Sequence, residues 1–174
     1  MNLDIYSKTT TPKALRDEQA TPNTVVRRIE QVMNVLFVHD VCASRKNKKC
    51  PTFWSKKGNA LTKNWACELA GTKSYLPVFW MNPPYSQLPE FTHKAWKEAR
   101  NGCIVVGLVP DMRSSKWYQT YIHDVCPTVW LPDGRINFEL EGVIRPGNGL
   151  PSCFPVWMPW EATTSYMYFN RKAP

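Results

Sequence analysis

Apolar side chains recur at helical spacing near the start of the chain. They fall on one face of a helix: Val25, Val26, Ile29, Val32 and Met33. Thr21 and Pro22 precede them, as a capping threonine and a proline at the first helical position. We therefore expect a helix that buries one face. Residues 1–20 are polar and show no such pattern, which predicts a flexible N-terminal arm.

Short apolar runs and a second helical pattern follow in the middle of the chain. Residues 35–38 predict a buried strand that ends at Asp40, and residues 77–81 predict a second strand. Helical spacing resumes over 88–99, and residues 103–109 form another apolar run. This order of strand, helix and strand predicts a βαβ unit, which requires a parallel sheet.

The last third of the chain changes to a β-like pattern. An amphipathic stretch over 117–125 precedes three apolar segments, at 128–131, 136–138 and 153–158. We therefore predict a three-layer α/β sandwich with a mostly parallel sheet and an antiparallel hairpin at its edge.

Length and composition narrow the class of protein. At 174 residues, the chain suits one domain over 21–160, with a C-terminal tail over 161–174. No apolar run approaches the ~18 residues of a membrane span. The six cysteines form no CxxC pair and no Cys/His cluster, so we expect reduced cytoplasmic thiols and no metal site.

The charge of the chain points to a polyanionic partner. Lys and Arg number 22 against 14 Asp and Glu, and nucleic acid is the commonest polyanion. Residues 41–67 hold no acidic residue and seven basic ones: Arg45, Lys46, Lys48, Lys49, Lys56, Lys57 and Lys63. Phe53, Trp54 and Trp65 are interleaved, so this segment suits phosphates and the flat faces of bases. The alternative is a solvated loop whose aromatic side chains pack on the core.

A proline-rich motif, Asn82-Pro83-Pro84-Tyr85, follows the second predicted strand. It falls at the carboxyl edge of the sheet, where open α/β folds bind ligands. Prolines donate no backbone hydrogen bond, so the turn leaves carbonyl groups directed outward. The Asn82 side-chain oxygen beside such a carbonyl offers two acceptors to one exocyclic amine, and Tyr85 can stack on the ring that carries it. On its own, the motif is also compatible with a turn that has no chemical role.

The motif matches the [DNS]PP[YFW] signature of the amino-methyltransferases that act on DNA bases. The chain more closely resembles the Dam-like adenine-N6 methyltransferases of phages and prophages. Further pieces of that family's pattern occur in order over residues 17–158: Asp17-Glu18, Thr21-Pro22, Asp40-Val41-Cys42-Ala43, Asn47, Cys50-Pro51, Leu61, Trp65, Lys94-Ala95, Gly102, Val105-Val106, Leu108-Val109-Pro110, Lys116-Trp117 and Gly134-Arg135-Ile136 with Phe138.

The resemblance implies a Rossmann-like, class I methyltransferase fold with S-adenosylmethionine as cofactor and double-stranded DNA as partner. The target adenine would swing out of the duplex into a pocket. Asn82 and the Pro83 carbonyl would hold its N6 amine for direct attack on the methyl group, with Pro84 shaping the turn. Tyr85 would stack on the base, and Phe138 or Trp117 could cover its other face.

The resemblance also implies which residues bind the cofactor. Asp40, followed by Cys42 and Ala43, would hold its amino-acid portion, and Thr21 and Pro22 would close over it. Larger methyltransferases have a glycine-rich loop here, which this chain lacks. The segment 41–67 also has no acidic residue to bind the ribose hydroxyls.

Several basic residues outside segment 41–67 are candidates for DNA contact. Lys116 follows another predicted strand end, and Arg135 lies in a turn before a strand. The predicted DNA-binding set consists of these two residues together with Arg45, Lys46, Lys48, Lys49, Lys56, Lys57, Trp117 and Phe138. The chain is too short for a separate target-recognition domain. Sequence choice would come from the loops at 44–64 and 139–152.

Several other functions remain open from the sequence. The motif suits any exocyclic amine, so cytosine-N4 methylation is possible, as is methylation of RNA or a nucleoside. A non-catalytic nucleic-acid-binding protein on a degenerate methyltransferase fold is the rival from another class. The resemblance further implies action in a bacterial host cytoplasm; the oligomeric state is not predicted.

Overall fold

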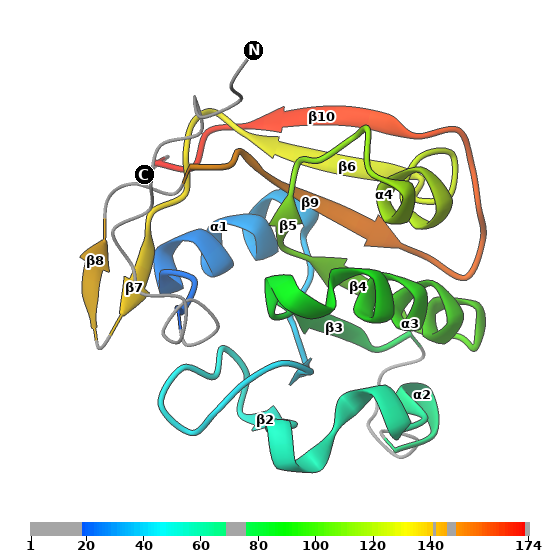
Figure 1. The fold of residues 1–174 in the computed structure, drawn as a ribbon, viewed down its shortest axis with the longest axis horizontal. Coiled ribbons are helices and arrows are strands. Elements are labelled where there is room, and N and C mark those ends of the chain that lie inside the picture. The colour runs from blue at the N-terminus through cyan, green and yellow to red at the C-terminus, as the bar shows by residue number, and fades with distance from the viewer. Residues whose placement is uncertain (1–18, 69–75, 141, 146–148, 173–174) are drawn as a thin grey trace.

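The structure is a computed structural model that describes residues 19–68, 76–140, 142–145 and 149–172. Its centre is an eight-stranded mixed sheet. The strands are β1 (His39–Asp40), β2 (Thr52–Phe53), β3 (Val78–Met81), β4 (Ile104–Gly107), β5 (Val109–Pro110), β6 (Thr128–Pro132), β9 (Ser152–Trp157) and β10 (Ser165–Phe169). Their order across the sheet is β10-β6-β9-β4-β3-β1-β2, with β5 paired to β9 (Figure 1).

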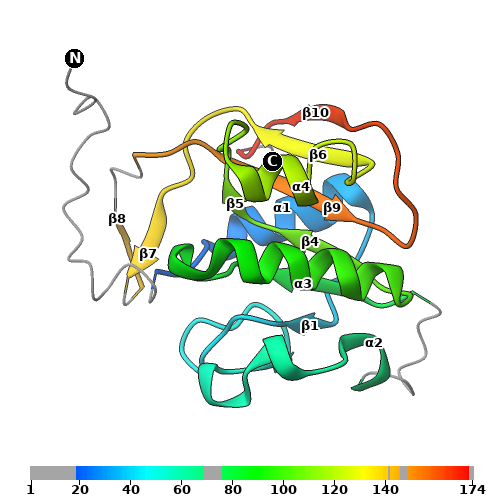
Figure 2. The same cartoon turned by 45° about the vertical axis from the view of Figure 1, so that its right-hand side comes forward.

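Helices cover both faces of the sheet, which gives the three predicted layers. Helix α1 (Asn23–Met33) lies on one face, and α3 (Leu88–Arg100) and α4 (Lys116–Tyr121) lie on the other (Figures 1 and 2). A short helix, α2 (Trp65–Glu68), follows 3₁₀ turns at Lys56–Gly58 and Ala60–Thr62. In the described residues, no helix is both long and apolar enough to span a membrane.

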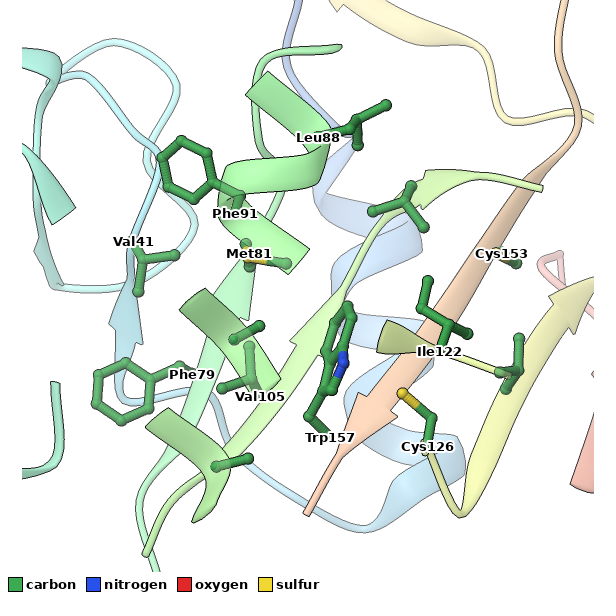
Figure 3. Packing of buried hydrophobic residues seen from close by; sticks show 14 of the residues in the cluster. Val41, Phe79, Met81, Leu88, Phe91, Val105, Ile122, Cys126, Cys153 and Trp157 are labelled. Atoms are coloured by element: carbon green, nitrogen blue, oxygen red, sulfur yellow. The ribbon is translucent and has the colours of Figure 1, made fainter. Parts of the chain in front are cut away.

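The alternation of side chains along each strand produces two hydrophobic cores. In β3, Phe79 and Met81 point to the face covered by α3, whereas Val78 and Trp80 point to the face covered by α1. Figure 3 shows the first of these cores, where side chains of α3 meet those of β3, β4 and β9. The βαβ unit β3–α3–β4 is parallel, as predicted.

The antiparallel part of the sheet differs from the prediction. The antiparallel strand, β9, lies inside the sheet between β4 and β6 and not at its edge. All six of its residues are buried, which suits a central position. The antiparallel hairpin, β7 (Phe138–Leu140) and β8 (Val143–Arg145), forms a separate two-stranded sheet.

Both predicted terminal boundaries also need correction. The predicted tail, 161–174, contains β10, which pairs in parallel with β6 over five residues and forms the sheet edge. At the other end, Ala20 lies within the predicted arm but forms an antiparallel bridge with Glu139. The tail prediction was wrong, and the predicted arm extends too far, because β10 and Ala20 pair with strands distant in the chain. Residues 1–18 lie outside the described part of the chain.

Candidate active site

Two predicted site residues meet at the carboxyl edge of the sheet. Strands β1 and β3 are parallel neighbours, and Asp40 is in register with Trp80. Asn82 comes two residues later, so both side chains reach the same edge. They line one pocket, whose nine residues are Gln19, Ala20, Thr21, Asp40, Cys42, Asn47, Lys49, Trp80 and Asn82.

The carboxylate of Asp40 is buried and accepts two backbone hydrogen bonds. Only 2% of the residue is exposed. One carboxylate oxygen accepts the N–H of Cys42 at 3.2 Å, and the other accepts the N–H of Lys49 at 2.9 Å. Burial is the main cause that raises the pKa of Asp40 to about 6, and these hydrogen bonds oppose it. A cationic ligand beside this buried carboxylate would stabilise its ionised form.

These hydrogen bonds explain how the loop after β1 folds without glycine. Asp40 ties both ends of the loop to its carboxylate, and Asn47 Oδ1 accepts the backbone N–H of Ser44 at 2.6 Å. No residue from 41 to 49 has a positive φ angle. Side-chain acceptors therefore shape this loop, and the special backbone freedom of glycine is not required.

The proline motif connects β3 to α3. Pro83 is buried, and the Pro84 carbonyl accepts the N–H of Gln87 at 2.9 Å, which closes the 3₁₀ turn Tyr85–Gln87. Tyr85, three residues after the pocket residue Asn82, is 38% exposed. The motif thus lies at a strand end, as the sequence predicted.

Thr21 contacts Asn82 directly. The Asn82 Nδ2 group donates to Thr21 Oγ1 at 3.2 Å, and Thr21 is only 1% exposed. The sequence predicted Thr21 as a helix cap, but α1 begins at Asn23 and Thr21 makes no capping hydrogen bond. Pro22, with a ψ of 138°, is the N-cap instead. The hydroxyl of Thr21 therefore interacts with the proline motif and not with the helix.

The other predicted cofactor residues lie at or beside the pocket. Cys42 lines it, whereas Ala43 is 8% exposed and pairs its N–H with the carbonyl of Trp54. Five pocket residues were absent from the predicted cofactor set: Gln19, Ala20, Asn47, Lys49 and Trp80. Asn47 was visible as part of the family pattern, but nothing local to the sequence marks the others.

The predicted DNA-binding residues separate into exposed and buried groups. The exposed ones are Arg45, Lys46, Lys48, Lys56, Lys57, Lys116 and Arg135. Lys49 instead lines the pocket and is half-buried. Phe138 is 5% exposed in the second core, so it offers no face to a base. Trp117 is partly buried against the first core.

The aromatic residues of the basic segment pack on the core. Trp65 is fully buried, and Trp54 packs against His39 with ring centres 4.1 Å apart and ring planes tilted by 49°. The expectation that these two rings offer faces to bases is therefore wrong, and the alternative of rings folded onto the core is confirmed. Phe53 is partly exposed, with the Lys48 ammonium 5.3 Å from its ring centre.

His39 is a packing residue and does not act on Asp40. Its Nδ1 lies 2.9 Å from Thr52 Oγ1, on the side of β1 away from the pocket. Burial lowers the pKa of His39 to about 4, so the ring is neutral at physiological pH. Among the described residues, no group of His, Cys, Asp and Glu side chains is arranged to hold a metal ion.

Comparison with known proteins identifies the family of this chain. The family model for DNA N-6-adenine-methyltransferase (Dam) matches residues 8–173, nearly the whole sequence. The chain belongs to this DNA adenine methyltransferase family. The resemblance drawn from the Asn82 motif and its surrounding pattern is therefore confirmed, together with the Rossmann-like fold class.

Two phage proteins named DNA N-6-adenine-methyltransferase are similar to this member of the family. The protein of Haemophilus phage HP1 is 31% identical over 136 residues, which cover 77% of this chain and 73% of the relative. The protein of Escherichia phage T1 is 29% identical over 137 residues, which cover 79% of this chain. The matched region spans about half (53%) of the T1 protein's length.

Proposed function

We propose that this chain methylates the exocyclic N6 amine of adenine in double-stranded DNA, with S-adenosylmethionine as methyl donor. One observation carries the proposal: Asp40 and Asn82 line the same pocket. A residue suited to the cofactor's charged end therefore lies beside a residue suited to an exocyclic amine. Family membership supports the same reaction.

The residues of the pocket fit the cofactor. Its amino-acid end carries an ammonium group, and the buried carboxylate of Asp40 is a suitable partner because a nearby cation offsets the cost of burial. The loop over 41–49 is shaped by the same carboxylate, so the binding site and the loop geometry depend on one residue. When bound, the cofactor supplies an electrophilic methyl group on its sulfonium.

The role of the protein in the reaction is to orient the attacking nitrogen. The hydrogen bond from Asn82 Nδ2 to Thr21 leaves Asn82 Oδ1 as the acceptor for one N6 hydrogen, and the Pro83 carbonyl is the proposed second acceptor. Drawing both hydrogens aside leaves the nitrogen lone pair to form the new N–C bond as the S–C bond breaks. The amine then loses a proton to solvent. Alignment and electrostatics supply the rate enhancement, and no enzyme nucleophile is needed.

The surface around the pocket is suited to DNA. Tyr85 is partly exposed next to Asn82, where its ring could stack on a flipped base. The exposed Arg45, Lys46 and Lys48 follow β1 on the same edge, and their charges favour phosphate contact. Double-stranded DNA is therefore the proposed partner. Single-stranded DNA is the alternative, and a transfer assay on both forms distinguishes the two.

A transfer assay tests the proposed function. Purified protein, S-adenosylmethionine with a labelled methyl group and unmethylated duplex DNA are incubated, and the DNA is digested to nucleosides. We expect label in N6-methyladenine. Label in N4-methylcytosine would change the proposed target base. Transfer to RNA but not to DNA, in a parallel reaction with RNA, would change the proposed polymer. DNA binding without any transfer or cofactor binding would contradict the proposal and support a non-catalytic DNA-binding protein.

A further inference from the structure

We propose that Lys49 binds the carboxylate of the methyl donor's amino-acid end and does not contact a DNA phosphate. This inference rests on the proposed function, because it takes S-adenosylmethionine as the ligand of the pocket. It reassigns a residue that the charge pattern of the sequence groups with the DNA-binding lysines.

Lys49 differs from its basic neighbours in position. Arg45, Lys46 and Lys48 are exposed, whereas Lys49 is half-buried and lines the pocket together with Asp40 and Asn82. Its backbone N–H donates to the Asp40 carboxylate at 2.9 Å, which holds this residue against the pocket wall. A phosphate of the DNA backbone would reach the exposed side chains of the loop first.

The ammonium of Lys49 has hydrogen-bonding capacity to spare. Its Nζ donates to Asn23 Oδ1 at 2.9 Å, and in the described part of the chain this is its only hydrogen bond. An ammonium group carries three N–H donors, so others remain for a ligand. Burial lowers the pKa of Lys49, opposed by the charges of Glu139 and Asp40, so a further anion beside the ammonium would be favourable.

The lining of the pocket thus includes an acidic and a basic residue, and the proposed ligand carries both charges. The amino-acid end of the cofactor carries an ammonium and a carboxylate on the same carbon. Asp40 matches the first and Lys49 matches the second, and backbone hydrogen bonding between the two residues fixes them as a pair. A zwitterion is recognised more specifically by such a pair than by either charge alone.

The test compares two ligands on one variant. S-adenosylhomocysteine keeps the amino-acid end, whereas 5′-methylthioadenosine lacks it. We expect Lys49→Met to weaken binding of S-adenosylhomocysteine by about tenfold or more, the typical effect of losing a hydrogen bond between charged groups. The affinity for 5′-methylthioadenosine should change by less than about twofold, and the affinity for duplex DNA should stay the same as in the wild type. Calorimetry for the ligands and a gel-shift titration for DNA give these values.

Lys46→Met is the matched control, because Lys46 is an exposed lysine of the same loop. It should weaken DNA binding and leave both small ligands unaffected. Lys49→Arg should restore much of the affinity for S-adenosylhomocysteine, and Lys49→Gln replaces the Met variant if that variant does not fold.

Three outcomes would overturn the inference. Unchanged affinity of Lys49→Met for S-adenosylhomocysteine would show that Lys49 does not contact the carboxylate. An equal loss of affinity for both small ligands would indicate general damage to the pocket. A loss confined to DNA returns Lys49 to the phosphate-binding set. If the wild-type chain binds neither small ligand, the proposed function itself fails. That outcome is distinct from a failure of the Lys49 inference, in which the wild-type chain still binds S-adenosylhomocysteine.

Discussion

At the scale of single residues, the orientation of the Asn82 carboxamide matters most. An asparagine amide has a donor end and an acceptor end, and only the acceptor end can take a hydrogen from an amine. The Thr21 hydroxyl, 3.2 Å from Asn82 Nδ2, engages the donor end. Thr21 is buried and Asn82 is partly buried, so water has limited access to the contact. In the proposed mechanism, Thr21 is therefore a positioning residue, in addition to its proposed contact with the cofactor.

Removing the Thr21 hydroxyl should slow catalysis without abolishing cofactor binding. Thr21→Val keeps the shape of the side chain but loses the oxygen, and a neutral hydrogen bond is worth about 0.5–1.5 kcal/mol. We expect kcat to fall about threefold to tenfold, with a smaller change in the KM for S-adenosylmethionine. Thr21→Ser, which keeps the hydroxyl, should restore most of kcat. Steady-state kinetics on the three proteins measures both constants; a KM effect alone would contradict the positioning role.

Cofactor affinity should fall in mild acid because Asp40 must be ionised to bind a cation. The pKa of its carboxyl is about 6, so protonation competes with the ligand below that pH. We expect binding of S-adenosylmethionine to be about tenfold weaker at pH 5 than at pH 7.5. His39 titrates near pH 4, below this window, and burial raises the pKa of Cys50 to about 12, above it.

Calorimetry across pH 5 to 8 gives the affinity, and Asp40→Asn is the control. The variant should bind more weakly than wild type at pH 7.5 and show little dependence on pH. An equal slope in both proteins would assign the titration to another group.

At the scale of elements, a buried carboxylate joins α3 to α2. Glu98 is 2% exposed, accepts the backbone N–H of Trp65 at 2.8 Å, and pairs with the Lys94 ammonium at 2.6 Å. The fully buried Trp65 is therefore held in place by a side chain from α3. Glu98 thus anchors the end of the segment 41–67, which carries exposed lysines, to helix α3.

Truncating Glu98 should destabilise the fold strongly. Glu98→Ala leaves the Lys94 ammonium, 13% exposed, without its carboxylate partner, and the Trp65 N–H without its acceptor. We expect the free energy of unfolding to fall by about 3–5 kcal/mol. Lys97→Ala, an exposed position on the same helix, should change it by less than about 0.5 kcal/mol. Urea unfolding measures both, and similar values for the two variants would contradict a structural role for Glu98.

The same scale explains which elements the sequence could predict. The helix α1 and the unit β3–α3–β4 are set by local periodicity, so their apolar faces were visible in the pattern. The central position of β9 and the pairing of β10 with β6 depend on partners far along the chain. A one-dimensional pattern carries little information about such pairing.

The candidate site shows the same division. Asp40 and Asn82 were predictable because strand ends in a parallel sheet meet at one edge. The pocket wall formed by Gln19 and Ala20 was not, since it depends on the two hydrogen bonds between Ala20 and Glu139. Lys49 was assigned by its charge alone, and only its position shows that it lines the pocket.

At the scale of the whole molecule, the elements around the candidate site lie near one edge of the sheet. The loop after β1, the start of α1 and the hairpin β7–β8 lie on the same side in both views (Figures 1 and 2). The chain carries a formal net charge of +8, and several exposed basic residues lie in the segments near this side. DNA approaching along this edge would bring its bases to the pocket opening.

The exposed lysines should determine the salt dependence of DNA binding. Each phosphate contact contributes about 0.9 to the slope of log affinity against log salt concentration. Replacing both Lys56 and Lys57 by Gln should therefore reduce the slope by about 1.8. Lys97→Gln, an exposed lysine on α3 outside the predicted DNA-binding set, should leave it unchanged. Fluorescence anisotropy between about 50 and 300 mM salt measures the slopes. An equal slope for the double variant and wild type would show that this pair does not contact DNA phosphates.

The central claim is that the Asn82 side chain directs methyl transfer from a pocket that also holds the cofactor. The most direct measurement is single-turnover transfer of labelled methyl to adenine by Asn82→Ala, with cofactor and DNA binding measured on the same protein. We predict that transfer falls by at least about a hundredfold, as for loss of a preorganised catalytic group. Both binding affinities should stay within about threefold of wild type, because the variant removes contacts made chiefly in the transition state. Transfer at the wild-type rate by Asn82→Ala would contradict the account.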